Sequence, residues 1–140
     1  MLAPVTDDDG APFWEYAARG ELRVQSCARP SCGEPRFPPR PCCPHCGSFD
    51  SEWRLMSGRG RIWSYAIPHP PLLPDYAAHA PYNVVVVELS DAPRIRLVGN
   101  VVTSPDAPLD SLDPARLRIG APVRAVFDGN GLPRWLPERP

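Results

Sequence analysis

The stretch CARPSCGEPRFPPRPCCPHCGS, residues 27–48, decides how the rest of the chain is interpreted, because it holds all five cysteines of the 140 residues. Its spacing is Cys27-x4-Cys32 and then Cys43-x2-Cys46, with a glycine directly after each pair. A tight turn of this kind aims two thiolates at one ion, and the glycine permits the positive φ that the turn needs. Four thiolates at about 2.3 Å fill the tetrahedral shell of a zinc ion and leave no open position. The spacing therefore predicts a structural zinc site.

Other interpretations of the cysteines stay open at this stage. Cys43 and Cys46 could form a C-x-x-C redox pair, although a second pair lies close by, or the turns could be remnants that no longer bind metal. A disulfide framework fits poorly, because the number of cysteines is odd. We interpret Cys42 as a bystander, since using it instead of Cys43 would widen the second spacing to three residues. His45, inside the second turn, is interpreted as an exposed turn residue.

Composition limits the function classes. The length fits one domain, or a small module and a slightly larger one, and the formal net charge is −1. All 15 basic residues are arginine, which excludes a Schiff-base lysine or a phosphate-loop lysine in this chain. No apolar run approaches the roughly 18 residues of a membrane span. Residues 1–11 have neither the basic nor the apolar region of a signal peptide. We therefore expect a cytoplasmic location and no membrane contact.

An aromatic segment precedes the cysteines. Aspartates at residues 7–9 favour a helix start, and Gly20 is expected to end the helix. Phe13 and Tyr16 fall on one helical face, and Trp14 lies off that face. Either this helix packs on the domain behind it, or the three aromatic residues anchor another protein.

Beyond the cysteines, apolar residues alternate with a period of two, which is typical of strands separated by turn signals. We predict strands at residues 21–26, 52–56, 60–67, 82–89, 94–102, 123–127 and 133–136. The run YNVVVV at residues 82–87 predicts a central strand that is buried on both faces. Gly99 is predicted to form a bulge where a small barrel bends.

These elements predict a mainly β fold. A short N-terminal arm and helix occupy residues 1–20, and a zinc ribbon occupies residues 21–56, where two strands flank the cysteine turns. About five strands remain in residues 57–140, and we expect them to form an antiparallel barrel of the OB type.

The order of the motifs resembles that of one known family. The motifs are RGEL at 19–22, RFPPR at 36–40, CPHCGS at 43–48, GRGRIWS at 58–64, APY at 80–82, VVVEL at 85–89 and IGAPV at 119–123. Together they resemble the acyl-CoA-associated OB-fold family, which has an N-terminal rubredoxin-like zinc ribbon, over roughly residues 12–137. The first cysteine turn departs from the family pattern by its four-residue spacing, where two residues are usual.

The resemblance implies a non-catalytic accessory subunit. Its expected partner is a thiolase-fold enzyme, namely a thiolase or a thiolase-like aldolase that cleaves steroid side-chain CoA thioesters. A hot-dog-fold enoyl-CoA hydratase is the alternative partner. The residues agree with this expectation, because the chain has no lysine and metal binding would occupy the cysteines. Candidate contacts to CoA or to a substrate channel are Arg59, Arg61, Trp63, His69 and Tyr76.

Several alternatives remain open for these residues. The arginines also suit the solvated side of a barrel strand, and a pair of His69 with Asp75 is a conceivable but weak acid–base set. A stand-alone OB-fold could bind acyl-CoA, or it could stack single-stranded nucleic acid on Trp63 and Tyr65. We do not expect nucleic acid, because the net charge is −1 and no basic stripe dominates.

Overall fold

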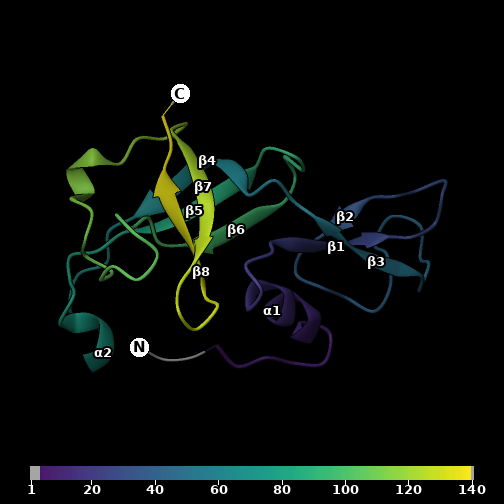
Figure 1. Cartoon of the computed structure of the whole chain (residues 1–140), viewed down its shortest axis with the longest axis horizontal. Coiled ribbons are helices and arrows are strands. Elements are labelled where there is room, and N and C mark those ends of the chain that lie inside the picture. Colours follow the sequence, from purple (N-terminus) through teal and green to yellow (C-terminus); the bar gives the residue numbers. More distant parts are fainter. Residues whose placement is uncertain (1–3, 140) are drawn as a thin grey trace.

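The computed structural model describes residues 4–139 and contains two antiparallel β-sheets with a short helix beside their junction (Figure 1). The first sheet consists of β1 (Arg23–Cys27), β2 (Pro35–Arg36) and β3 (Ser51–Leu55), in the order β2-β1-β3. Its central strand, β1, ends on the first cysteine. The sheet therefore has the layout of the predicted zinc ribbon.

The second sheet has five strands in the order β6-β5-β4-β7-β8. They are β4 (Arg59–Ala66), β5 (Val84–Leu89), β6 (Arg96–Gly99), β7 (Pro122–Phe127) and β8 (Pro133–Pro137). The two edges meet just beyond β6, where a parallel bridge joins Val101 to Trp135. There the Trp135 N–H donates to Asn100 O at 3.0 Å, and the Val102 N–H donates to Trp135 O at 2.9 Å. The sheet thus closes into the predicted OB-type barrel.

Two details of the barrel differ from the sequence predictions. The strand expected at residues 94–102 is only four residues long, because the chain leaves β6 after Gly99 to reach β8. The bulge expected at Gly99 is wrong: Gly99 pairs in register with Val85, and the register shift lies in β4, between Ile62 and Ser64. A glycine at position 99 instead leaves room for the indole of Trp135, because a Cβ there would lie 2.9 Å from Trp135 Nε1.

The burial predicted for β5 was also wrong. Its six residues alternate between buried and half-buried positions instead of being buried on both faces. Val85, Val87 and Leu89 point into the barrel, while Val84 and Val86 lie on its outer face. The helix and the ribbon cover a different part of the barrel, so β5 behaves as a strand with one solvent-facing side.

The helix α1 (Ala11–Ala17) is shorter than predicted and ends three residues before Gly20, which adopts a φ of 77° in the turn that follows. Phe13 belongs to one continuous apolar core with Val24 of β1 and with Leu97 and Trp135 of the barrel. The helix therefore packs on the domains behind it and fixes how the ribbon meets the barrel.

Two short helical elements were not predicted. They are α2 (Pro74–Ala77), after β4, and the 3₁₀ helix η1 (Pro114–Arg116), before β7. Each lies in a proline-rich connection and begins with a proline, whose fixed φ suits the first helical position. Figure 1 shows α2 at the end of the barrel that is remote from the ribbon.

Candidate metal centre and partner surfaces

The four cysteines predicted as ligands converge at the end of the ribbon. The sulfur atoms of Cys27, Cys32, Cys43 and Cys46 all lie within 4.8 Å of one another. Cys27 Sγ is 3.6 Å from Cys46 Sγ, and Cys32 Sγ is 3.7 Å from Cys43 Sγ. Four sulfurs at about 2.3 Å from a central zinc ion would stand about 3.8 Å apart. The arrangement therefore fits a tetrahedral zinc ion and is much too open for a disulfide.

Local backbone bonds shape the second cysteine turn. The Cys43 N–H donates to Ser48 O at 2.8 Å, and the Gly47 N–H donates back to Cys43 O at 2.9 Å. Gly47 has a φ of 75°, which side-chain-bearing residues rarely adopt. The His45 N–H points at Cys43 Sγ, 3.4 Å away. Because backbone N–H groups stabilise a thiolate, this turn prepares its sulfurs for a cation.

The thiols differ in acidity, for physical reasons that follow from this geometry. The backbone N–H of Ser48 lowers the pKa of Cys46 to about 7. Burial raises the pKa of Cys43, but N–H groups of Cys46 and His45 outweigh it and the net shift is downward. The N–H of Glu34 lowers the pKa of Cys32, but burial and the three neighbouring thiols raise it to about 12. Four adjacent thiolates repel one another, so full ionisation of the cluster requires a cation among them.

This donor set fits structural zinc. Four thiolates satisfy the ion completely, so the centre has no position for water or substrate and supplies folding energy instead of chemistry. Cys42 is exposed and lies outside the cluster, as its assignment as a bystander requires. His45 is likewise exposed and is not part of the donor set.

The three aromatic residues of α1 have different environments. Phe13 is buried, with its ring 5.1 Å from that of Trp14 and 5.5 Å from that of Phe37. Trp14 is half-buried. Tyr16 lies 6.3 Å from the ring of Trp53 and carries the guanidinium of Arg23 4.8 Å above its own ring.

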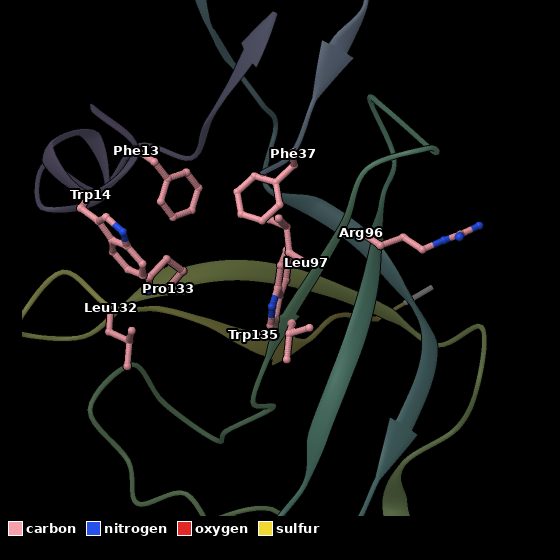
Figure 2. A pocket seen from close by; sticks show the side chains of 9 residues that line it. Phe13, Trp14, Phe37, Arg96, Leu97, Leu132, Pro133 and Trp135 are labelled. Atoms are coloured by element: carbon pink, nitrogen blue, oxygen red, sulfur yellow. The ribbon is translucent and has the colours of Figure 1, made fainter. Parts of the chain in front are cut away.

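An apolar hollow of about 240 Å³ opens beside Trp14, between α1, the ribbon and the barrel. Figure 2 shows the rings of Phe13, Phe37 and Trp135 facing this space, while the Arg96 side chain extends away from it. On the rim, Val98 of β6 is 72% exposed. We refer to this space as the apolar hollow.

The five candidate contacts for CoA are spread along the barrel. Arg59 and Arg61 flank Gly60 at the start of β4, where Arg61 Nη1 donates to Gly120 O at 3.0 Å. Trp63 lies beneath the guanidinium of Arg96, at 4.0 Å. His69 and Tyr76 lie beyond the end of β4, and Tyr76 belongs to α2. His69 is exposed in the connection before α2, and Tyr76 packs against Tyr82 with ring centroids 6.1 Å apart.

Sequence reasoning missed two buried arginines. Arg36 is 4% exposed and bonds through Nε to Gln25 Oε1 at 3.0 Å. Arg134 donates through Nη1 to the carbonyls of Pro105 and Ala107, at 2.9 and 2.6 Å, and so holds the loop before η1 against β8. Desolvation lowers the pKa of Arg134. The only sequence signal for Arg36 was its place in the RFPPR motif.

Comparison with known proteins decides the family. Two domain models match the chain: the rubredoxin-like zinc ribbon domain of ChsH2 over residues 14–52, and the C-terminal OB-fold domain of ChsH2 over residues 53–128. The chain belongs to the ChsH2 family of zinc-ribbon and OB-fold proteins. The solved structure of the Ltp2-ChsH2(DUF35) aldolase contains a chain that is 36% identical to this one, with a TM-score of 0.79. The alignment covers 96% of this chain and 98% of that chain.

Relatives of the ChsH2 family are described in two ways. A probable enoyl-CoA hydratase alpha subunit of Thermomonospora curvata is 39% identical over 86% of this chain. The 3-oxo-4,17-pregnadiene-20-carboxyl-CoA hydratase alpha subunit of Mycobacterium tuberculosis is 33% identical over 91%. The aligned parts are only 33% and 36% of those two proteins, so this chain spans about a third of their length. A DUF35 domain-containing scaffold protein of Methanocaldococcus jannaschii is 32% identical, over 69% of this chain and 62% of that protein.

Two further findings bear on the site. None of the helices in residues 4–139 has the length and apolar character needed to cross a membrane. The ribbon and barrel matches meet at residues 52 and 53, within β3, where the ribbon passes into the barrel.

Proposed function

We propose that this ChsH2-family chain is a non-catalytic scaffold subunit of a complex that processes acyl-CoA thioesters. We further propose that its catalytic partner is a thiolase-like aldolase, or a thiolase, that degrades steroid or lipid side chains. The observation that carries the proposal is the similarity to a chain of the Ltp2-ChsH2(DUF35) aldolase, which extends over 98% of that chain. A metal centre closed by four cysteines supports a structural role, because it offers no position to a substrate.

A hydratase partner is the second candidate. The names of the Thermomonospora and Mycobacterium relatives favour it, since both are hydratase alpha subunits. We place the aldolase first because the aldolase chain is matched over almost its whole length, whereas only about a third of each hydratase subunit aligns.

The surface that we propose for the partner is the apolar hollow together with Trp14. Phe13, which belongs to the apolar core, forms its floor (Figure 2). The exposed Val98 forms part of its lining. An exposed apolar depression with an aromatic wall suits an apolar anchor residue from another protein. Tyr16 would contact the partner only at the edge of this surface, because it packs toward Trp53.

The outer side of β4 is the proposed place for contacts to CoA. Arg59 and Arg61 are exposed there, and Trp63 is 48% exposed beneath Arg96. In the same proposal, His69 and Tyr76 approach the substrate from the connection after β4. The four thiols must stay reduced to bind metal, which favours a reducing compartment such as the cytoplasm.

The test is co-expression with a thiolase-like aldolase, followed by co-purification and an assay of retro-aldol cleavage of a steroid side-chain CoA thioester. We expect a stable complex, and loss of cleavage when the small subunit is left out. Full cleavage by the large enzyme alone would contradict the proposal. Parallel co-expression with a hot-dog-fold hydratase distinguishes the second candidate, which requires a stable complex with that enzyme instead.

A pair of matched variants tests the proposed surface. Val98→Asp places a charge on the rim of the hollow and should abolish co-purification. Ile119→Asp introduces the same charge at another β-branched apolar residue, 69% exposed, that does not line the hollow, and it should leave the complex intact. Equal effects of the two variants would exclude the apolar hollow as the docking surface.

A further inference from the structure

A second hollow, of about 340 Å³, lies on the ribbon side of the junction and shares only Phe37 with the apolar hollow. The segment of residues 34–40 forms one wall, and the tip of the second cysteine turn forms another. Arg94 and Ile95, which directly precede β6, form the third wall. Prolines 35, 38 and 44 line it as well, so its walls have little conformational freedom to lose on binding. We refer to it as the arginine hollow.

Positive charge is concentrated in the arginine hollow. Arg36, Arg40 and Arg94 line it, and Glu34 is the one carboxylate among its lining residues. This contrasts with the whole chain, whose formal net charge is −1. Within residues 4–139, the side chains of Arg40 and Arg94 make no hydrogen bond or ion pair. Two guanidinium groups are therefore available to a ligand.

Arg36 adds a buried cation to this wall. Its Nε donates to Gln25 Oε1, and its Nη2 donates to Arg40 O at 3.0 Å. Gln25 Oε1 also accepts the Arg40 N–H at 2.7 Å, so the two arginines are held by one glutamine. Arg36 Nη1 is buried and has no hydrogen-bond partner, and no carboxylate in the described part of the chain pairs with Arg36. A buried charge without a counter-charge is costly, and a bound anion would offset that cost.

The chemistry of the wall selects the kind of anion. Guanidinium groups are planar forks that bind phosphate and carboxylate oxygens in pairs, and they lose little entropy for each bond formed. Three of them around one space carry more positive charge than a single carboxylate would neutralise, whereas a phosphate group carries up to two negative charges near neutral pH. The volume is ample for a tetrahedral oxyanion.

We propose that the arginine hollow binds a phosphate group, held by Arg40 and Arg94 over the buried charge of Arg36. The phosphate comes either from a phosphate ester such as coenzyme A or from free inorganic phosphate. The proposal does not depend on which enzyme is the partner.

Calorimetric titration of the zinc-loaded, full-length chain at low salt tests the site, with inorganic phosphate, coenzyme A and phosphate-free pantetheine as probes. We expect phosphate and coenzyme A to bind, pantetheine not to bind, and high salt to weaken both interactions. Tighter binding of coenzyme A than of phosphate would identify the ester as the source, provided that Arg40→Gln and Arg94→Gln remove the difference, because contacts on the outer side of β4 would not respond to these two variants. Equal binding would identify the free anion. No heat from either phosphate-bearing probe would overturn the proposal.

Matched charge variants decide whether binding occurs at this place. Arg40→Gln and Arg94→Gln should each weaken binding about tenfold, the effect of one lost hydrogen bond to a charged group. Arg116→Gln removes the same charge from the exposed end of η1, far from the ribbon, and should bind normally (Figure 1). If all three variants bind alike, the arginine hollow is not the site. Unchanged zinc content in each variant shows that the ribbon is folded.

Discussion

The ribbon and the barrel reach a stable fold by different interactions. Inside the barrel most of the fully buried side chains are apolar, as Val85, Leu89 and Trp135 illustrate, although Asn83 and Arg134 are buried there as well. Inside the ribbon, Gln25, Ser26 and Arg36 are buried beside two of the cysteines. The ribbon strands are also short, at five, two and five residues. A region of this size cannot bury enough apolar area to fold unaided, so metal ligation and hydrogen bonds complete it.

The same difference distinguishes the apolar hollow from the arginine hollow. The barrel contributes apolar side chains to the apolar hollow, because its outer face need not be polar throughout. The ribbon contributes fixed polar groups and prolines to the arginine hollow, because its interior already depends on placed hydrogen bonds. The comparison predicts that loss of the metal disrupts the arginine hollow much more than it disrupts the core of the barrel.

The largest expected effect is on the ribbon. Cys43→Ser and Cys46→Ser should each abolish zinc binding and unfold the ribbon, because metal ligation supplies roughly 10 kcal/mol or more in small zinc domains. Zinc stoichiometry and the dispersion of ribbon amide signals in NMR spectra measure this effect. Cys42→Ser is the control and should keep one zinc ion per chain. Equal damage from all three variants would show that the ligand assignment is wrong.

The second largest effect is expected on acidification, which should disrupt the ribbon before the barrel. A metal-bound thiol has a pKa well below its value of about 8.5 in the unfolded chain. Its contribution to the stability of the fold is therefore complete above that value, and it is lost as the pH falls through the lower pKa of the bound thiol. Zinc should therefore stay bound at neutral and alkaline pH and be released on acidification, while the apolar barrel persists to lower pH. A zinc indicator follows the first event, and the amide signals of the barrel strands in NMR spectra follow the second. Simultaneous loss of both signals would mean that the regions unfold as one unit.

The third largest effect is expected from Trp135→Ala, which should destabilise the barrel. Trp135 is 1% exposed and closes the barrel through its bonds to the chain beyond β6. Deleting this ring should lower the free energy of unfolding by about 3–5 kcal/mol, measured by denaturant titration. Trp63→Ala removes the same ring from a position that is 48% exposed and should cost much less. A similar loss in both variants would argue against Trp135 as the residue that closes the barrel.

Gly60→Ala is expected to have the smallest effect of the series. A Cβ at this position would lie 2.5 Å from Val87 Cγ1 and 2.7 Å from Glu88 O, because β4 crosses β5 closely here. Overpacking of this kind should cost about 1–3 kcal/mol. Gly129→Ala is the matched control, since its Cβ would approach nothing closer than 3.4 Å. Thermal unfolding midpoints of the two variants measure the difference, and equal midpoints would contradict the close approach.

Much of the fold could be predicted before the structure was known. The ribbon strands around the cysteines, the positions of most barrel strands along the chain and the short aromatic helix all follow from local patterns. The ends of β6 and the alternating burial of β5 could not be predicted, because they depend on where Trp135 and α1 pack. The strand β2 escaped prediction, since two residues are too few for a pattern.

The sequence by itself determined the metal centre and the family. Thiolate ligands lie close together in the chain, and their spacing reports the geometry of the turns that hold them. Tertiary structure alone decided that Phe13 enters the core and that Arg36 is buried without a counter-charge. It also created the two hollows, because each is lined by segments that are far apart in the sequence. Burial and unpaired charge are set by distant neighbours, and no local pattern in a sequence records them.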